Sequence, residues 1–461
     1  MEAQGTKVNR ITEGSIFGQL LLFFFPILLG TFFQQLYNTA DAMVVGRFVG
    51  KQALAAVGGT TSTLINLLVG FFVGLSSGAT VVISQYYGAR KADKVHWAVH
   101  TSVTFSIIGG IVFMLIGLTC SSFALRAMNT PEDVIGPALV YIRIYFLGMI
   151  PNLIYNMGAG ILRAVGDSRR PLYFLIISCF VNIVLDIAFV AGLKMGVAGA
   201  AIATIMSQFV SAILVTRAML STDDMYKLEP KALKIDQRML RRIVRIGVPA
   251  GMQSVIYNVS NIIIQAGVNS LGTDNVTAWA TYGKVDGLYW MMINALGISA
   301  TTFVGQNYGA GRMDRVRKGT GACVLIGMLM TGGISIVLYN WGMVLVELFI
   351  TDAQVQSICM SLIHFMVPTF ITYVTIEILS GSLRGVGDAW MPLILTGVGI
   401  CAVRVVWIIF ALPHFHSILG AAFCYPLTWS LTTVAFVVYY YFFSTLRRVK
   451  VRIPRPFGRR R

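Results

Sequence analysis

The sequence predicts an all-α polytopic membrane protein with twelve transmembrane helices in two parallel six-helix lobes. Three observations predict this fold class: an apolar composition, twelve separate apolar segments, and a repeat that relates the two halves of the chain. Hydrophobic residues make up 56% of the 461 residues and charged residues only 12%, and the mean hydropathy is +0.74. Soluble globular domains carry far more charge than this, so the chain belongs in lipid.

The chain divides into apolar segments of the length that a membrane span needs, about 20 residues. Met1 to Ser15 is polar and the first apolar run continues for a full span, so we expect no cleaved signal peptide. The second segment is long enough to be tilted or bent. The twelve spans are predicted near residues 17–44, 53–83, 97–119, 135–162, 172–193, 198–219, 240–269, 276–304, 319–345, 354–383, 393–413 and 418–443.

The basic residues predict the orientation of the chain in the membrane, and a polar stretch near its midpoint, with Asp223, Asp224, Glu229 and Pro230, predicts its division into domains. The formal net charge is +17. Counted from the N-terminus, the even-numbered loops between spans carry short clusters of basic residues and the odd-numbered loops carry few, so the even-numbered loops are expected to face the cytoplasm. Such clustering is not typical of nucleic-acid binding. We expect a multi-pass protein of the inner or plasma membrane with both termini cytoplasmic. The predicted domains are an N-terminal lobe (14–220), a cytoplasmic linker (221–238), a C-terminal lobe (239–445) and a basic cytoplasmic tail (446–461).

An internal repeat relates the two halves at one constant spacing. The block Gln85-Tyr-Tyr-Gly-Ala returns as Gln306-Asn-Tyr-Gly-Ala, and the positions 85 and 306 differ by 221. The block Leu162-Arg-Ala-Val-Gly-Asp returns at the same offset as Leu383-Arg-Gly-Val-Gly-Asp. Because each half holds an even number of spans, the halves are parallel repeats, an arrangement that transporters often use.

These repeated blocks have a predicted structural role. The Gly of each Gln-x-Tyr-Gly-Ala block is expected to be a helix C-cap. In the second block, Arg163 with Asp167 and Arg384 with Asp388 lie at the cytoplasmic mouth, where they can form ion pairs or cap the next helix. Gating is the alternative role for these four residues.

Buried charge is the main functional signal. Of the 19 acidic residues, only Asp41, Asp186, Asp286 and Glu377 lie well inside apolar spans. A carboxylate at mid-membrane costs at least about 2.5–3.5 kcal/mol, so it normally faces an internal cavity, a partner or a cation. These four residues are therefore the candidates for a functional site.

Polar residues at helical spacing accompany the first two acids. Gln34, Asn38 and Asp41 occupy positions i, i+4 and i+7, and Tyr37 precedes Asp41 by one turn. Asn182 with Asp186, and Asn152 with Asn156, are also one turn apart. Carboxylates with neutral oxygens suit Na⁺, whereas two neighbouring carboxylates can equally share a proton. A buried hydrogen-bond network that only fixes packing is the alternative.

The segment Gln34-Gln-Leu-Tyr-Asn-Thr-Ala-Asp-Ala-Met-Val-Val-Gly-Arg-Phe-Val-Gly and the two repeated blocks resemble the multidrug and toxic compound extrusion (MATE) family of the MOP superfamily. Within it the chain is similar to the DinF-like branch, because Asp41 is joined by Asn182 and Asp186. The NorM-like branch has an acid in span seven, where this chain has none. The resemblance implies that Tyr37, Asp41, Asn156, Asn182, Asp186 and Thr204 form a cation or proton site, with Na⁺ possible at Asp41 and Asp186.

The second half carries weaker signals. Span seven has a polar stripe of Tyr257, Asn258, Asn261 and Gln265 without charge, and a substrate cavity is predicted over Gln34, Asn38, Tyr257, Asn261 and Gln265. Lys284, Asp286, Glu377 and Arg404 form a charged set that could neutralise itself as structural ion pairs or serve as a second coupling or substrate site. Pro26 removes a backbone hydrogen bond in span one and is the predicted hinge.

The resemblance implies a secondary active multidrug exporter that antiports small organic compounds against H⁺ or Na⁺, without enzymatic activity. Its expected partners are the substrate, the coupling ion and the bilayer, and a monomer suffices. No cofactor is expected, because the six cysteines are scattered singly. The absence of a GxxxxGK[ST] motif argues against an ATP-driven pump. The alternative is a flippase for a lipid-linked saccharide or another amphipathic lipid, because Lys284 and Arg404 could bind an anionic headgroup. A passive channel is disfavoured.

Overall fold

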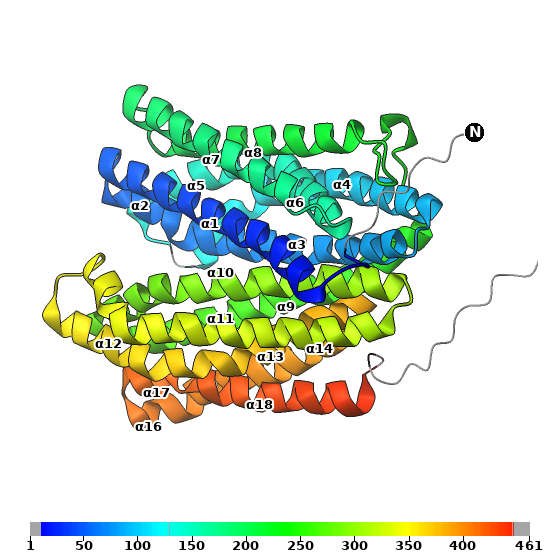
Figure 1. Ribbon diagram of the computed structural model, residues 1–461. Coiled ribbons are helices and arrows are strands. Elements are labelled where there is room, and N and C mark those ends of the chain that lie inside the picture. The colour runs from blue at the N-terminus through cyan, green and yellow to red at the C-terminus, as the bar shows by residue number, and fades with distance from the viewer. Residues whose placement is uncertain (1–10, 129, 445, 447–461) are drawn as a thin grey trace, which may run out of the picture. The chain divides into compact units, whose positions relative to one another are not determined.

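A computed structural model describes residues 11–128, 130–444 and Leu446, and all regular secondary structure in this part of the chain is helical. The basic tail predicted over residues 446–461 lies outside the described residues except for Leu446, and so do the first ten residues. Within each of the two compact units, Figure 1 shows long helices that run side by side.

The first half consists of nine helical elements. They are α1 (Ile16–Phe48), α2 (Lys51–Gly58), α3 (Thr60–Gly88), α4 (Ala92–Ala127), α5 (Glu132–Leu147), α6 (Met149–Ala164), α7 (Arg169–Asp186), the π-helical η1 (Ile187–Gly192) and α8 (Gly196–Leu220). An irregular stretch after Leu220 contains only one short 3₁₀ turn, η2 (Pro230–Ala232), before α9 begins at Gln237.

The second half repeats this plan with more interruptions. Its elements are α9 (Gln237–Asn269), α10 (Thr273–Gly309), α11 (Met313–Glu347), α12 (Ala353–Met366), η3 (Val367–Thr369), α13 (Phe370–Val386), α14 (Trp390–Thr396), η4 (Gly397–Ala402), α15 (Val403–Val406), η5 (Trp407–Ala411), α16 (Leu412–Phe415), α17 (Ile418–Ala422), α18 (Cys424–Val438) and η6 (Tyr439–Phe443).

The described helices follow the positions of the twelve predicted spans, and up to eleven of them are long and apolar enough to cross a membrane. Ten helical stretches are long and apolar enough to cross a membrane, and α5 with α6 forms an eleventh span that bends by 52°. The twelfth is α9, which has 33 residues but is less apolar because it carries the polar stripe that includes Asn258 and Asn261. The bend between α5 and α6 lies at Gly148, where a Cβ atom would overlap Ile205 of α8.

The chain forms two compact units, which are described separately. Among the described residues, the first unit comprises 22–83 and 91–255, and the second comprises 11–21, 84–90, 256–444 and Leu446. The first unit extends beyond α8 because the first half of α9 packs on α3: Cβ atoms on Gly74 and Gly78 would meet the backbone around Gly251 and Gly247. Only residues without side chains allow this close approach of two helices.

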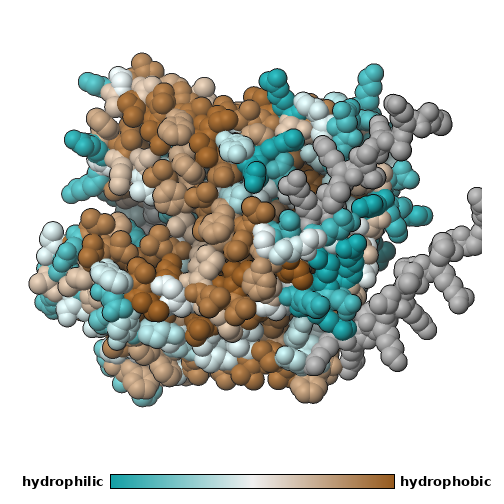
Figure 2. All heavy atoms as spheres, viewed as in Figure 1, coloured by the Kyte–Doolittle hydropathy of each residue, from teal (hydrophilic) through white to brown (hydrophobic). Residues whose placement is uncertain are grey.

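Both units expose large apolar side chains, as expected for helices that contact hydrocarbon. Phe123 and Ile213 in the first unit are 78% and 62% exposed, and Leu329 and Leu348 in the second are 67% and 74% exposed. Figure 2 shows apolar side chains over the middle of the helices on the visible face, and hydrophilic ones gathered toward the helix ends. The chain is thus a polytopic membrane protein.

The structure assigns the glycines of the repeated Gln-x-Tyr-Gly-Ala blocks a role other than the predicted C-cap. Gly88 and Gly309 are the last residues of α3 and α10, and the left-handed residues lie two positions later, at Arg90 (φ 54°) and Gly311 (φ 74°). A Cβ on Gly88 would overlap the backbone oxygen of Gln306, and a Cβ on Gly309 would overlap that of Gln85. The C-cap prediction was wrong, because these glycines are required by a reciprocal helix contact.

The Asp residues of the second repeated block cap the following helices, as predicted. Asp167 Oδ1 accepts hydrogen bonds from the backbone N–H groups of Arg169 and Arg170, each at 3.1 Å. Asp388 Oδ1 accepts a longer one, of 3.4 Å, from Met391 N–H, and its Oδ2 accepts from the Tyr439 hydroxyl at 2.7 Å. A carboxylate at these helix starts satisfies N–H groups that lack an intrahelical partner.

Replacing Gly309 with Ala should destabilise the protein by about 1–3 kcal/mol, the range for overpacking a tightly packed contact. The matched control is Gly321→Ala, also inside a helix, where an added Cβ meets nothing within 4 Å. Thermal unfolding in detergent, followed by size-exclusion chromatography, measures the difference. Equal melting temperatures for the two variants would show that the contact has no such role.

Candidate functional site

A cluster of buried polar side chains lies inside the first unit. Asp41 comes from α1, Asn182 and Asp186 come from the last turns of α7, and Thr204 comes from α8. Asn182 and Asp186 have no exposed surface, and Asp41 and Thr204 are 5% and 2% exposed. Such complete burial of two carboxyl groups in a membrane protein requires partners that offset the lost hydration.

The two carboxyl groups face each other. Asp186, Thr204 and Tyr141 are the polar neighbours of the Asp41 carboxyl. However, Asp41 Oδ1 and both oxygens of Asp186 are buried without a hydrogen-bond donor among the residues that the structure describes. Two ionised carboxylates are both acceptors and repel each other, so this pair needs a proton or a cation between its oxygens.

Tyrosine and glutamine side chains surround the carboxyl pair. Tyr37 lies close enough to both acids to interact with them electrostatically, and it is also a neighbour of Gln208 on α8. Tyr145 of α5 also reaches Gln208, and its ring lies 6.3 Å from that of Tyr141, one turn earlier. Tyr141, Tyr145 and Gln208 are not among the residues predicted from the sequence. The signal was present, because Tyr141 with Tyr145 and Thr204 with Gln208 follow the same one-turn spacing as the residues that were found.

The structure brings most of the predicted first-half site together. Tyr37, Asp41, Asp186 and Thr204 are close neighbours, and Asn182 lies one turn before Asp186 with its amide nitrogen and oxygen buried and unpaired. Asn156 is the exception. Its Nδ2 donates to Asn152 Oδ1 at 3.0 Å and to the Asn152 backbone oxygen at 2.9 Å, within α6. No contact between Asn156 and the acids is recorded in the described part of the chain.

The predicted substrate-cavity residues differ from the acids in exposure. Gln34 and Asn38 are exposed although Asp41, further along the same helix, is buried. In the second unit, Asn261 is exposed, and Gln265 donates to Asn269 Oδ1 at 2.8 Å. The Tyr257 hydroxyl lies 3.5 Å from that of Tyr373. Their role as a substrate surface stays a prediction.

The four charged residues predicted in the second half do not neutralise one another as a single cluster. Glu377 of α13 pairs with Arg384, two turns later, at 3.6 Å, and accepts from the Tyr373 hydroxyl at 3.4 Å. Lys284 is exposed, and its Nζ lies 4.7 Å from the centre of the Phe349 ring. Glu377 has a partner on its own helix, which makes a structural ion pair the simplest account of that residue.

Asp286 and Arg404 lie among aromatic rings. Trp290 Nε1 donates to Asp286 Oδ2 at 2.7 Å. The Arg404 guanidinium stands 4.0 Å from the Tyr425 ring and 6.0 Å from the Trp429 ring, and its Nε donates to Thr428 at 3.3 Å. Arg404 is only 2% exposed. Asp286 Oδ1 and Arg404 Nη2 are buried without a hydrogen-bond partner in the described structure, so both groups retain binding capacity.

The described residues contain no group of three His, Cys, Asp or Glu side chains that could hold a metal ion. The carboxyl pair and its neutral oxygens form a buried set of oxygen ligands inside the first unit. Its two carboxylates, one threonine hydroxyl and one tyrosine hydroxyl are ligands that Na⁺ accepts, and the same pair can hold a single proton.

Twelve spans, a repeated half and buried carboxyl groups together define a polytopic protein of the transporter class. A family model, MatE, matches residues 26–188 and 249–410. The chain therefore belongs to the MatE family, which confirms the predicted resemblance. The two matched blocks each cover one copy of the internal repeat.

Curated relatives and solved structures agree with this assignment. The chain is 29% identical over 440 residues to "Probable multidrug resistance protein YoeA" of Bacillus subtilis (strain 168), covering 94% of this chain and 95% of the relative. It is 22% identical to "Multidrug export protein MepA" of Staphylococcus aureus (strain NCTC 8325 / PS 47), covering 81% and 80%. The fold matches an outward-facing MATE family transporter of the MOP superfamily with a TM-score of 0.90 at 21% identity, covering 97% of this chain and all of the other. It also matches a MATE in the bent conformation, with a TM-score of 0.87 at 20% identity, covering 94% and 96%.

Removing Arg384 should leave Glu377 as an uncompensated charge. Because both side chains are largely buried, 18% and 15% exposed, Arg384→Gln should lower the free energy of unfolding by about 3 kcal/mol, the lower end for a broken buried pair. The double variant Arg384→Gln/Glu377→Gln should recover much of this loss. Thermal unfolding of the two single variants and the double variant measures the coupling, and strictly additive losses would contradict a direct ion pair.

Proposed function

We propose that the protein is a secondary active multidrug exporter, which antiports small organic and often cationic compounds against H⁺ or Na⁺. The observation that carries this proposal is the Asp41–Asp186 pair, which is buried inside one unit without a donor for three of its oxygens. The drug-resistance and drug-export names of the relatives support the export of such compounds. The protein would work as a monomer in the cell membrane, with cytoplasmic termini.

The carboxyl pair supplies the coupling chemistry. When the pair holds one proton or one Na⁺, the repulsion between its oxygens is removed and α1 is held close to α7. When the cation leaves, two negative charges remain close together in a medium of low polarity. Their repulsion favours either the separation of α1 from α7 or the rapid binding of another cation. The hydroxyl groups of Tyr37, Tyr141 and Thr204 lie near the pair. They would lower the free energy of the pair when no cation is bound.

Cation loading would move α1. Pro26 lies inside this unbroken helix and cannot donate to the carbonyl of Leu22, so the helix bends there at low cost. The π-helical turn η1 starts immediately after Asp186, and such turns loosen the regular hydrogen-bond ladder. A change in attraction between Asp41 and Asp186 would thus be converted into a bend of α1 that changes the exposure of Gln34 and Asn38, the substrate-surface residues predicted on the same helix.

The second half offers an additional site. Asp286 and Arg404 retain unpaired atoms among the rings of Trp290, Tyr425 and Trp429. Such surroundings would accept an aromatic substrate or a second ion. A flippase for lipid-linked saccharides would need several cationic side chains in one cavity. Lys284 is exposed beside Phe349 and Arg384 is paired with Glu377, and neither these contacts nor the family assignment favours that alternative.

Transport by inverted vesicles tests this proposal. Uptake of a fluorescent organic cation, driven by an outward-directed H⁺ or Na⁺ gradient, should fall at least about tenfold in Asp41→Asn and in Asp186→Asn, because neither variant can hold a cation between two carboxylates. The ion whose gradient drives uptake is the coupling ion.

The control is Asp223→Asn, which removes a carboxyl that is 97% exposed, and it should transport at the wild-type rate. Gradient-driven uptake at the wild-type rate in Asp41→Asn would contradict the assigned coupling site. No uptake by the wild-type protein under either gradient would instead favour the flippase alternative.

A further inference from the structure

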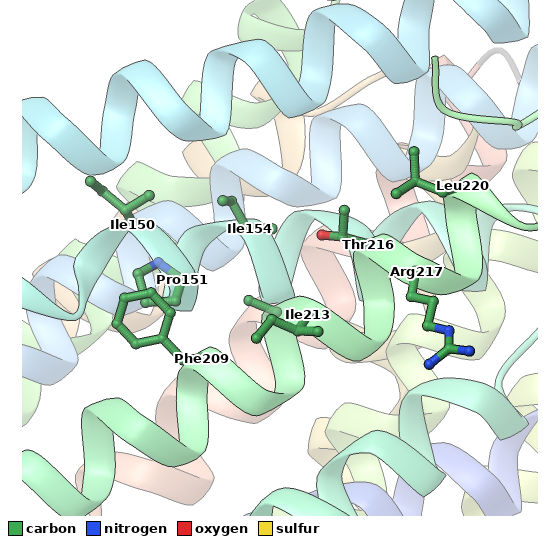
Figure 3. A pocket seen from close by; sticks show the side chains of 9 residues that line it. Ile150, Pro151, Ile154, Phe209, Ile213, Thr216, Arg217 and Leu220 are labelled. Carbon is green, nitrogen blue, oxygen red and sulfur yellow. The ribbon is translucent and has the colours of Figure 1, made fainter. Parts of the chain in front are cut away.

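A crevice lies between α6 and α8, on the opposite face of α8 from the carboxyl pair. Its volume is about 340 Å³, and it is lined by Ile150, Pro151 and Ile154 of α6 and mainly by Phe209, Ile213 and Arg217 of α8. Figure 3 shows the apolar side chains of the two helices facing the same space, with Arg217 at one end. This volume is in the range of small-molecule sites.

The shape of the crevice follows from where the two helices touch. A Cβ on Gly148 would overlap Ile205, and a Cβ on Gly158 would lie 2.7 Å from Val215, so α6 and α8 are in close contact at both positions. Ile150 and Ile154 lie on α6 between these contacts. The break between α5 and α6 at Gly148, with its 52° bend, leaves the space beside Pro151 open.

The crevice opens to hydrocarbon. Phe209 and Ile213 are 48% and 62% exposed, and Leu220, which also lines the crevice, is 38% exposed. Thr204, Ser207 and Gln208, on the other face of α8, are buried inside the unit. Exposed residues of this type at the middle of a transmembrane helix contact lipid, so an acyl chain is the group that the crevice accommodates.

Arg217 gives the crevice a charged end. It lies in the last turn of α8, is exposed, and forms no ion pair or side-chain hydrogen bond recorded for the described residues. Its backbone oxygen is occupied by the N–H and the hydroxyl of Ser221, at 3.0 and 2.8 Å. The helix end therefore does not need the guanidinium. Arg217 lies three residues before the end of α8, which has 25 residues. At this position in a transmembrane helix, the guanidinium is at the depth of the lipid headgroups.

We propose that this crevice binds an anionic phospholipid, with one acyl chain along Ile150, Ile154 and Ile213 and the phosphate group on Arg217. A guanidinium binds a phosphate through two parallel hydrogen bonds, and anionic lipids are concentrated in the cytoplasmic leaflet, to which the basic-loop pattern assigns this end of α8. Phe209 and Gln208 are neighbours on α8 but face opposite sides. The lipid would therefore pack on the outer face of α8, and Thr204 and Gln208 lie on its inner face.

Native mass spectrometry of the purified protein tests the proposal, with phosphatidylglycerol and phosphatidylcholine of identical acyl chains as probes. The wild type should retain more phosphatidylglycerol. Arg217→Gln should reduce this preference by about fivefold, the effect of one basic residue at an anionic surface. Ile213→Trp should fill the crevice and reduce retention of both lipids. Because residue 213 is 62% exposed, this change should leave the size-exclusion profile unchanged.

The matched control is Arg126→Gln, which removes an exposed arginine from the last turn of α4, away from the crevice. It should keep the wild-type lipid preference. The proposal is overturned if the wild type shows no preference for phosphatidylglycerol, if Arg217→Gln keeps that preference, or if Arg126→Gln loses it equally. Retention of both lipids at wild-type levels by Ile213→Trp would also overturn the assignment of the acyl chain to this crevice.

Discussion

Two carboxyl groups buried against each other in a membrane protein impose the central constraint on this structure. Asp41 and Asp186 are almost completely inaccessible and face each other with three oxygens that no described donor reaches. The interior cannot hold both as free anions at low cost. Repeated binding and release of a cation by this pair would explain three features together. These are the surrounding hydroxyl and amide groups, the π-helical turn after Asp186 and the proline in α1.

The internal repeat conserves the packing but not the charge. Reciprocal contacts of Gly88 with Gln306 and of Gly309 with Gln85 use equivalent positions of the two halves. By contrast, the positions 221 residues after Asp41 and Asp186 hold Ile262 and Trp407. The second half therefore has no counterpart of this carboxyl pair at the equivalent positions. The second half instead places an acid, Glu377, where the first has Asn156, and pairs it with Arg384.

Most of the fold was predictable because lipid imposes long apolar helices, and the twelve spans follow from the apolar runs alone. The acids were found for the same reason, since charge inside such runs is rare. Tyr141 and Gln208 were missed because tyrosine and glutamine are unremarkable in a span until the partner helix is known. The role of Gly88 depends on a residue more than 200 positions away, so no local pattern reveals it. The Glu377–Arg384 pair, seven residues apart on one helix, could have been recognised.

Direct measurement of cation exchange on the purified protein tests the central claim about the carboxyl pair. Addition of an organic cation to wild-type protein in weakly buffered detergent solution should release about one proton, or displace about one bound Na⁺ in a calorimetric titration, because one pair holds one cation. Asp41→Asn and Asp186→Asn should each abolish that exchange. Release of the same number of ions by wild type and both variants would contradict the account.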